Sequence, residues 1–349
     1  MASDFRIVDQ PLARSVCDGC GLARRLPSLE AESFYESGYE LYAHTPGGTR
    51  EHERQMAYAE WIGRAVPAAP RRVLDIGCGN GSLLRALKTC WPDALMFGCD
   101  PSAEAVAHGR GDGVELWHGT GDDLPADVAA DVVVTINVIE HTPDPLRFLH
   151  SAHRRVSPDG TLIVVCPDGG EPGFELLFVD HLFSFARPHL ESLVRRAGMT
   201  VAASAPAPPS LGLFQMVVGR RSDTSEPARV DVRVDGSRRE LYLQRWREID
   251  ERLAARLRPP VVCFGASEAA GLLRAYAPHS WALVTACTAD GAAAGTFGDT
   301  PIVPLEDVLP QTTLLLGVRP SDQPRLADRL AARFHHVVAW YDLVDVEHG

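Results

Sequence analysis

The feature that most constrains this chain is an apolar run that ends in a glycine-rich turn and continues with the apolar pattern of a helix. Residues 72–84 read RVLDIGCGNGSLL, with Asp75 near the end of the run and glycines at 77, 79 and 81. Glycine lets the backbone adopt positive φ and approach a ligand, and a helix start offers N–H groups and partial positive charge. The turn is therefore expected to hold the carboxylate of a bound amino acid, with Asp75 meeting its ammonium group.

The segments that follow repeat this alternation of strand and helix. Apolar, β-branched runs are expected as strands, and the segments between them carry apolar residues at helical spacing. The expected strands are 71–77, 94–100, 114–119, 131–138 and 161–167, with 199–205 and 213–219 as a closing antiparallel pair. This alternation predicts an α/β fold with a Rossmann-like parallel sheet covered by helices on both faces. A helix over 52–66 is expected to precede the sheet.

A polar stretch at 222–236 is expected to link this unit to a charged helix over 237–257 and a second series of apolar runs. The second series predicts a smaller Rossmann-like α/β domain, with strand-bearing runs at 281–290, 312–318 and 336–344. This second domain is expected to serve as a scaffold or dimer surface, and the alternative is a phosphate bound at the helix start in its turn at 264–271. The expected divisions are an N-terminal lid over 1–60, an α/β domain over 61–221, a linker and helix over 222–259, and a second domain over 260–349.

The net charge and the placement of the cysteines indicate which partners and which cellular compartment to expect. The formal net charge is −12 and the arginines are scattered, so a small-molecule substrate is expected rather than a nucleic acid. A signal peptide and any run of about 18 apolar residues are missing, so no membrane partner is expected. The eight cysteines lie mostly in apolar runs, which is typical of buried thiols in a reducing cytoplasm. The sequence leaves open whether the chain forms a homodimer.

A second acidic residue completes the pattern around the glycine turn. Asp100 ends the second expected strand, where a carboxylate can accept both hydroxyls of a ribose. The spacing D-x-G-x-G-x-G of residues 75–81 differs from the G-x-G-x-x-G of dinucleotide sites. It resembles the first motif of the class I methyltransferases. INVIEHTPDP at 136–145, with its Glu140–His141 pair, resembles a later segment of the same superfamily.

The resemblance implies S-adenosyl-L-methionine as the cofactor. The residues that it implies as cofactor-binding are Asp75, Gly77, Cys78, Gly79, Gly81, Asp100, Pro101, Thr120, Gly121 and Asn137. Thr120 stands where the family often has an acid that contacts the adenine amine, so the backbone at 120–121 or Asp122 is expected to substitute. No catalytic metal is expected, because methyl transfer needs mainly an aligned acceptor and a base.

A polar pair lies in an aromatic segment after the fifth expected strand. Asp180 and His181 begin the stretch DHLFSF at 180–185. A histidine with an ordinary pKa of about 6.5 can act as a base at neutral pH, and the adjacent acid can orient it. The alternative is a structural histidine that caps the following helix. His141 is expected to shape the loop after the fourth strand. The histidines expected on exposed helix faces are His150, His153 and His189.

The whole chain resembles the bacterial C-methyltransferases of nucleotide-linked deoxysugars. Members of that family join an N-terminal zinc-ribbon segment, a methyltransferase core and a C-terminal Rossmann-like unit. The resemblance implies that Asp180 and His181, helped by a tyrosine, remove a proton beside a ketone, and that the enolate takes the methyl group. By match the tyrosine is Tyr39, with Tyr35 and Tyr42 as alternatives. O-methylation of a sugar or antibiotic hydroxyl is the alternative reaction, and a non-catalytic regulatory protein that binds the cofactor is an alternative of another class.

Cys17 and Cys20 form a single C-x-x-C. A structural zinc site needs about four ligands, and the second pair of the resembled family has no counterpart here. We therefore expect the remnant of a zinc ribbon without a metal. Zinc shared with His44 or His52 is the alternative.

Overall fold

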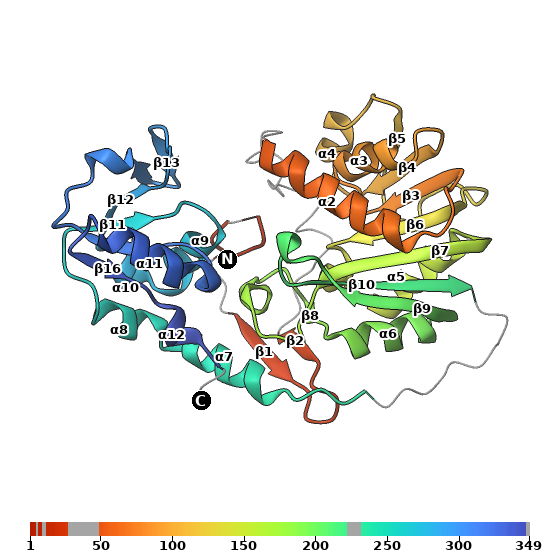
Figure 1. Cartoon of the computed structure of the whole chain (residues 1–349). Coiled ribbons are helices and arrows are strands. Elements are labelled where there is room, and N and C mark those ends of the chain that lie inside the picture. Colours follow the sequence, from red (N-terminus) through yellow and green to blue (C-terminus); the bar gives the residue numbers. More distant parts are fainter. Residues whose placement is uncertain (5, 9–11, 27–48, 222–231, 347–349) are drawn as a thin grey trace. The chain divides into compact units, whose positions relative to one another are not determined.

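The computed structural model describes residues 1–4, 6–8, 12–26, 49–221 and 232–346 (Figure 1). The chain divides into two compact units, Gln10–Gly236 and Met1–Asp9 with Ser237–Gly349. In the described part of the chain, no helix is both long and apolar enough to cross a membrane.

The larger unit is built on a seven-stranded sheet with the strand order β5-β4-β3-β6-β7-β10-β9. Its strands are β3 (Arg72–Ile76), β4 (Leu95–Asp100), β5 (Val114–His118), β6 (Ala130–Ile136), β7 (Val156–Pro167), β9 (Met199–Pro206) and β10 (Phe214–Arg221). The first five are parallel, and β10 is antiparallel to both β7 and β9. The predicted parallel sheet and its closing antiparallel pair are therefore confirmed.

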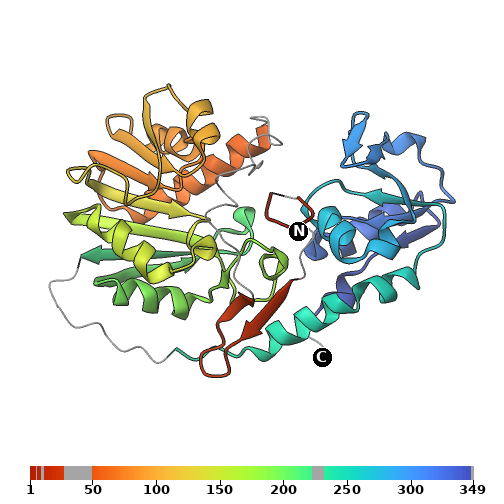
Figure 2. The ribbon, with the colours of Figure 1, turned by 180° about the vertical axis from the view of Figure 1, so that it is seen from behind.

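Helices cover both faces of this sheet, as the two opposite views show (Figures 1 and 2). One face packs against α2 (Thr49–Ala65) and α3 (Ser82–Cys90), and the other against α5 (Pro145–Arg154) and α6 (Arg187–Arg196). Successive side chains of a strand point to opposite faces, so Val132 and Val134 join the first core and Val133 the second. The short helix α4 (Ala103–His108) follows β4.

Residues 13–26 form a hairpin that belongs to the larger unit. Strand β1 (Ala13–Val16) pairs with β2 (Ala23–Leu26), and β2 also pairs with β8 (Phe183–Ser184), which makes a separate three-stranded sheet. Of the expected lid over 1–60, residues 13–26 form this hairpin and Thr49 begins α2. The hairpin adds strands to the segment after β7, and α2 packs on the main sheet because its apolar face is buried there.

The smaller unit has a six-stranded sheet with the order β13-β14-β12-β11-β15-β16. Its strands are β11 (Val261–Phe264), β12 (Val284–Thr288), β13 (Gly295–Phe297), β14 (Thr300–Ile302), β15 (Thr313–Leu316) and β16 (His336–Val338). Its helices are α7 (Ser237–Arg247), α8 (Ile249–Ala254), α9 (Glu268–Tyr276), α10 (Pro278–Trp281), α11 (Gln323–Ala331) and α12 (Tyr341–Val344). The predicted second α/β domain is present.

Several expected boundaries in the smaller unit differ from the structure. The charged helix is two helices, α7 and α8, which pack with the smaller unit instead of forming a separate linker. The expected strand at 281–290 is preceded by the end of α10, and the run at 336–344 turns into α12 after three strand residues. Apolar runs as short as these fit a buried helix turn as well as a strand, so periodicity cannot separate them.

Candidate active site

The glycine turn joins β3 to α3 at the carboxyl edge of the main sheet. Gly77, Gly79 and Gly81 have φ values of +84°, +53° and +75°, which other residues rarely adopt. The N–H groups of Gly77 and Cys78 donate to the Cys99 carbonyl on neighbouring β4, at 2.8 and 3.1 Å. A Cβ atom at Gly77 would overlap the Val138 side chain in the loop after β6. The turn therefore lies directly against that loop.

Asp75 is buried at the base of this turn. Its side chain is 2% exposed, and its Oδ1 atom has no hydrogen-bond partner among the described residues. Burial, together with the nearby charge of Asp100, raises the pKa of Asp75 to about 8. An unpaired buried carboxyl group of this kind fits a cationic ligand group such as an ammonium.

Asp100 closes the turn from the tip of β4. Its Oδ2 accepts the Gly79 N–H at 2.7 Å and its Oδ1 accepts the Ser102 N–H at 2.8 Å. A carboxylate has about four lone-pair positions, so the two that remain fit the hydroxyls of a ribose. Burial raises the pKa of Asp100, although the hydrogen bonds from Ser102 and Gly79 act in the opposite direction. The next residue, Pro101, is held through its carbonyl by His118 Nε2 at 3.0 Å.

The start of α3 offers fewer open N–H groups than the sequence predicts. The Ser82 N–H and hydroxyl both donate to Asn80 Oδ1, at 3.1 and 2.7 Å, and the Gly81 N–H donates to the Cys78 carbonyl at 2.8 Å. The Asn80 side chain thus takes the role of a helix cap. Cys78 itself is buried, and burial raises the pKa of its thiol.

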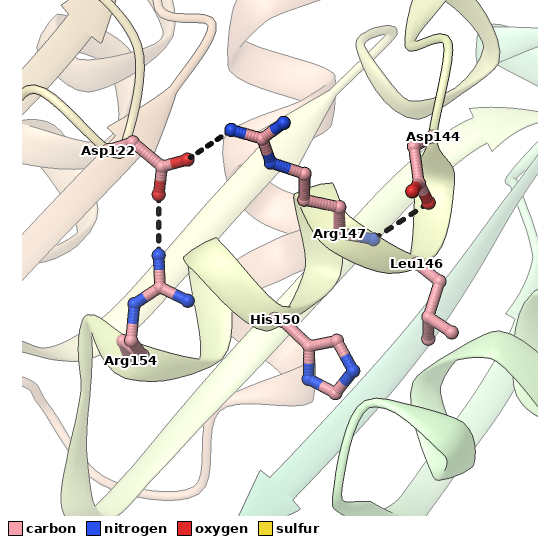
Figure 3. Close-up of a pocket in the computed structure, with 6 residues that line it drawn as sticks. All are labelled: Asp122, Asp144, Leu146, Arg147, His150 and Arg154. Carbon is pink, nitrogen blue, oxygen red and sulfur yellow. Dashed lines mark hydrogen bonds and ion pairs between the residues drawn. The ribbon is translucent and has the colours of Figure 1, made fainter.

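The loop after β5 contains the two residues expected near an adenine. The N–H and hydroxyl of Thr120 both donate to Asp123 Oδ2, at 2.8 and 2.7 Å, and the Gly121 carbonyl accepts from Arg155 Nε at 3.1 Å. Asp122 turns away toward α5, where it accepts from Ser151 and Arg154 and lies 3.9 Å from Arg147 (Figure 3). The Asp122 carboxylate is therefore already paired with α5, and the Thr120 N–H and the Gly121 carbonyl are likewise occupied within the protein.

Asn137 follows β6 and has a positive φ of +55°. Its N–H donates to the Val165 carbonyl at 3.0 Å, and its side-chain Oδ1 is buried without a partner among the described residues. The hydroxyl of Tyr58 on α2, a residue that is 2% exposed, lies near the Asn137 side chain and accepts from Arg54 at 3.4 Å. Burial raises the pKa of Tyr58. The sequence did not single out Tyr58, because α2 reads as an ordinary amphipathic helix.

A cluster of buried polar side chains adjoins this loop. The 3-10 helix η1 (Ile139–His141) carries Glu140 and His141, and the chain after β7 brings Asp180 and His181 beside them. The rings of His141 and His181 meet edge to face, with centroids 4.7 Å apart. His141 Nδ1 lies 3.0 Å from the Asp180 carbonyl oxygen and 3.7 Å from Asp180 Oδ2. Asp180 and His181 are thus brought to one site, but the Asp180 carboxylate lies against His141.

Glu140 is the most unusual member of this cluster. It is 2% exposed, and neither carboxylate oxygen has a hydrogen-bond partner among the described residues. Burial raises the pKa of Glu140 to about 7, while burial lowers the pKa of His141. Ligand atoms of Glu140, His141 and His181 lie within 4.8 Å of one another, a spacing at which the three side chains could hold a metal ion. From the sequence, the Glu140–His141 pair was identified by resemblance, with His141 expected to shape the loop and no separate role for Glu140.

His189 differs from the expectation of an exposed helix face. It is buried, its Nδ1 accepts the Ala186 N–H at 3.0 Å, and its Nε2 lies 2.7 Å from the Cys20 carbonyl oxygen. His189 therefore caps α6 and ties it to the N-terminal hairpin, a structural role that the sequence analysis had considered for His181. His150 is exposed and His153 partly buried.

Three of the residues named from the sequence, Tyr35, Tyr39 and Tyr42, lie outside the described residues, as does His44. Cys17 and Cys20 form the turn between β1 and β2, where backbone N–H groups of Cys20 and Gly19 lower the pKa of Cys17. Within the described ranges they join no group of three or more metal-ligand side chains.

The larger unit is similar to known methyltransferases. Residues 50–204 match the sequence model of the family described as "Methyltransferase domain". Ubiquinone biosynthesis O-methyltransferase of Azotobacter vinelandii is 36% identical over 115 residues, which are 31% of this chain and 50% of that protein. The protein of the same name from Aromatoleum aromaticum is 30% identical over 139 residues, 38% of this chain and 58% of its own length. The chain thus spans about half the length of the curated relatives that it matches.

Among solved structures, magnesium protoporphyrin IX methyltransferase from Synechocystis PCC 6803 with bound SAM aligns with a TM-score of 0.43 at 15% identity. The alignment covers 56% of this chain and 99% of that one.

Proposed function

We propose that this chain, which contains a class I methyltransferase domain with S-adenosylmethionine as its cofactor, methylates a small molecule at a carbon beside a ketone. A nucleotide-linked keto-deoxysugar or a related natural-product intermediate is the proposed substrate class. The observation that carries the proposal is the buried cluster of two histidines and two acids, Glu140, His141, Asp180 and His181, beside the loop that touches the glycine turn. A protein that only bound the cofactor would not need these groups, because burying them costs free energy.

The residues of the turn fit the cofactor. Asp75 would take its ammonium group and Asp100 its ribose hydroxyls, because each has acceptor capacity that the protein leaves open. When bound, S-adenosylmethionine supplies a methyl group on a sulfonium, which is already activated for displacement. The protein must therefore align the acceptor and take its proton.

His181 is the proposed base. It removes the proton from the carbon beside the ketone, the C–H electron pair becomes the enolate, and that carbon then takes the methyl group. The imidazolium formed at His181 is compensated by the acidic groups around it, Glu140 and Glu175. A tyrosine of the N-terminal segment, Tyr39 by match, remains a proposed partner, and the buried Tyr58 beside Asn137 is a second candidate.

A hydroxyl acceptor is the second candidate function. Both curated relatives described above are named as O-methyltransferases. For a hydroxyl group, alignment supplies much of the rate, so loss of a base leaves more activity than it does for a carbon acceptor.

The test is methyl transfer from isotope-labelled S-adenosylmethionine to paired keto-sugar nucleotides and their hydroxyl analogues, read by mass spectrometry. The expected product carries one methyl group on the carbon beside the ketone. His181→Ala is expected to abolish that product while calorimetry still detects cofactor binding.

A second readout isolates the proton-transfer step. With S-adenosylhomocysteine in place of the cofactor, the wild-type protein in D₂O is expected to exchange the proton beside the ketone, and His181→Ala is not. Methylation at oxygen alone, without exchange, would reject the carbon acceptor. Bound cofactor without transfer to either acceptor set would instead favour a regulatory binding protein.

A further inference from the structure

We infer that Glu175, and not the adjacent Asp180, is the positioning residue that fixes the ring of His181. The inference rests on His181 as the proposed base. Glu175 lies in the 3-10 helix η2 (Phe174–Leu177), six residues before that histidine. Its Oε2 atom is 3.9 Å from His181 Nδ1.

These two atoms are a hydrogen-bond donor and an acceptor that both lack a partner. Glu175 Oε2 and His181 Nδ1 are both buried, and neither has a hydrogen-bond partner among the described residues. Buried polar atoms are seldom left unpaired, because each then loses its hydrogen bond to water. A shift of about 1 Å would bring the pair into normal N–H···O range. A donor and an acceptor that face each other in this way are best satisfied by one another.

Other hydrogen bonds fix the Glu175 carboxylate and the 3-10 helix that carries it. Its Oε1 accepts the Ser184 hydroxyl at 2.6 Å, a buried hydrogen bond to β8. The Arg14 guanidinium on β1 donates to the backbone carbonyls of Glu175, Leu176 and Phe178, at 3.5, 2.5 and 2.8 Å. The N-terminal hairpin and β8 therefore fix the 3-10 turn and leave Oε2 to face His181.

Asp180 has a different neighbour. Its carbonyl oxygen and its Oδ2 lie 3.0 and 3.7 Å from His141 Nδ1. The cluster is thus two carboxylate–histidine couples, Glu175 with His181 and Asp180 with His141, whose rings meet edge to face at 4.7 Å. Sequence adjacency suggested a single couple of Asp180 with His181.

The assignment has a chemical consequence. A carboxylate that accepts from Nδ1 favours the tautomer with a proton on Nδ1, which leaves the lone pair of Nε2 to take a proton from substrate. In Ser-His-Asp catalysis the buried acid has this same function, and an amide in its place favours the wrong tautomer. Glu175 therefore acts on the reaction through His181 without touching substrate.

The test reads the tautomer directly. The protein is labelled with ¹⁵N-histidine, and the ring signals of His181 are identified by their loss in His181→Asn. In the wild-type protein, neutral His181 is expected to carry its proton on Nδ1. Glu175→Gln keeps the side-chain shape but offers an amide, so the Nε2–H form is expected to gain population. Ser184→Ala, which only loosens Glu175, is expected to give a smaller shift in the same direction.

Asp180→Asn is the matched control, and it is expected to leave the His181 tautomer unchanged. In turnover assays Glu175→Gln is expected to lower kcat by about 10²- to 10⁴-fold with little change in KM. An unaltered His181 tautomer in Glu175→Gln, or a tautomer lost in Asp180→Asn, would overturn the inference. The tautomer signals need no turnover, so they separate this inference from failure of the proposed function, which would appear as a wild-type protein inactive on every acceptor.

Discussion

At the scale of single residues, the candidate cofactor site contains groups whose protonation and backbone conformation differ from those of exposed residues. Asp75 is buried where its charged form is disfavoured, and Gly77 occupies a backbone conformation that places it against Val138. Both features cost stability in the absence of a ligand. Such local costs are typical of binding sites, because the ligand supplies the missing partner.

Asp75→Asn is expected to separate binding from stability. The amide carries no negative charge to form an ion pair with the ammonium group, so affinity for S-adenosylmethionine should fall by about ten- to a hundredfold. The free protein should become more stable at pH 8, because the substitution removes the cost of burying a carboxylate. Titration calorimetry and thermal unfolding measure the two effects. The control is Asp93→Asn at an exposed carboxylate. Equal affinity of Asp75→Asn and wild type would contradict the assignment.

Gly77→Ala tests the close approach of the turn to the loop after β6. Gly113 has a similar φ, +75° against +84°, but a Cβ there meets nothing within 4 Å. Gly113→Ala should therefore lower the free energy of unfolding only by the cost of placing alanine in a left-handed backbone conformation, about 1–2 kcal/mol. Gly77→Ala should cost more and should also weaken cofactor binding, since a Cβ there overlaps Val138. Denaturant unfolding compares the free energy of unfolding of the two variants. Equal decreases would show that overlap with Val138 adds nothing to the cost at Gly77.

At the scale of elements, the central part of the fold could be predicted from the sequence. The β-branched run around Val132–Val134 and the glycine turn after β3 have local signals strong enough to place a parallel sheet and its site edge. The helical end of the run at 336–344 was not predicted, because a short apolar stretch fits either a helix or a strand. The pairing of the N-terminal hairpin with β8 has no local signal, since it joins residues about 160 positions apart.

Arg14→Met is expected to show that this hairpin supports the candidate site. Without its guanidinium, the carbonyls of Glu175 and Phe178 lose their donor, so the turn before His181 should open more often. Hydrogen exchange should rise over 175–182, turnover should fall about tenfold, and cofactor affinity should stay unchanged. Arg24→Met, at an exposed arginine of the same hairpin, is the control. Unaltered exchange over 175–182 would contradict a supporting role.

At the scale of the whole molecule, the two α/β units and the cofactor-binding edge followed from the order of motifs, whereas the polar cluster did not. Glu140 and Glu175 come from two 3-10 helices and Tyr58 from α2, and these elements are distant in sequence. Glu175 and Tyr58 belong to no motif, and the motif that contains Glu140 assigns it no separate role. Their chemistry arises from burial in the folded chain. A sequence predicts which residues are able to titrate, but their neighbours in space decide whether they do so in an unusual range.

The last prediction concerns the stability of the free protein as pH changes. The folded pKa values of Asp75 and Glu140 are raised to about 8 and about 7, above their ordinary values of 3.8 and 4.5. Each group therefore contributes stability at low pH that is lost as pH rises through its folded pKa. His141 has a lowered pKa, so its contribution has the opposite sign and is complete above its ordinary value of 6.5.

Between pH 6.5 and 8 the two carboxyl groups should consequently dominate. The free energy of unfolding should fall with pH, by at most about 1.4 kcal/mol per pH unit for each group that stays protonated. Urea unfolding at several pH values measures the slope, and Asp75→Asn should flatten it. S-adenosylmethionine should bind more tightly as pH rises from 6 to 8, because its ammonium pairs with ionised Asp75. A slope that Asp75→Asn leaves unchanged would mean that this carboxyl group ionises in its ordinary range, and that its burial is relieved by water.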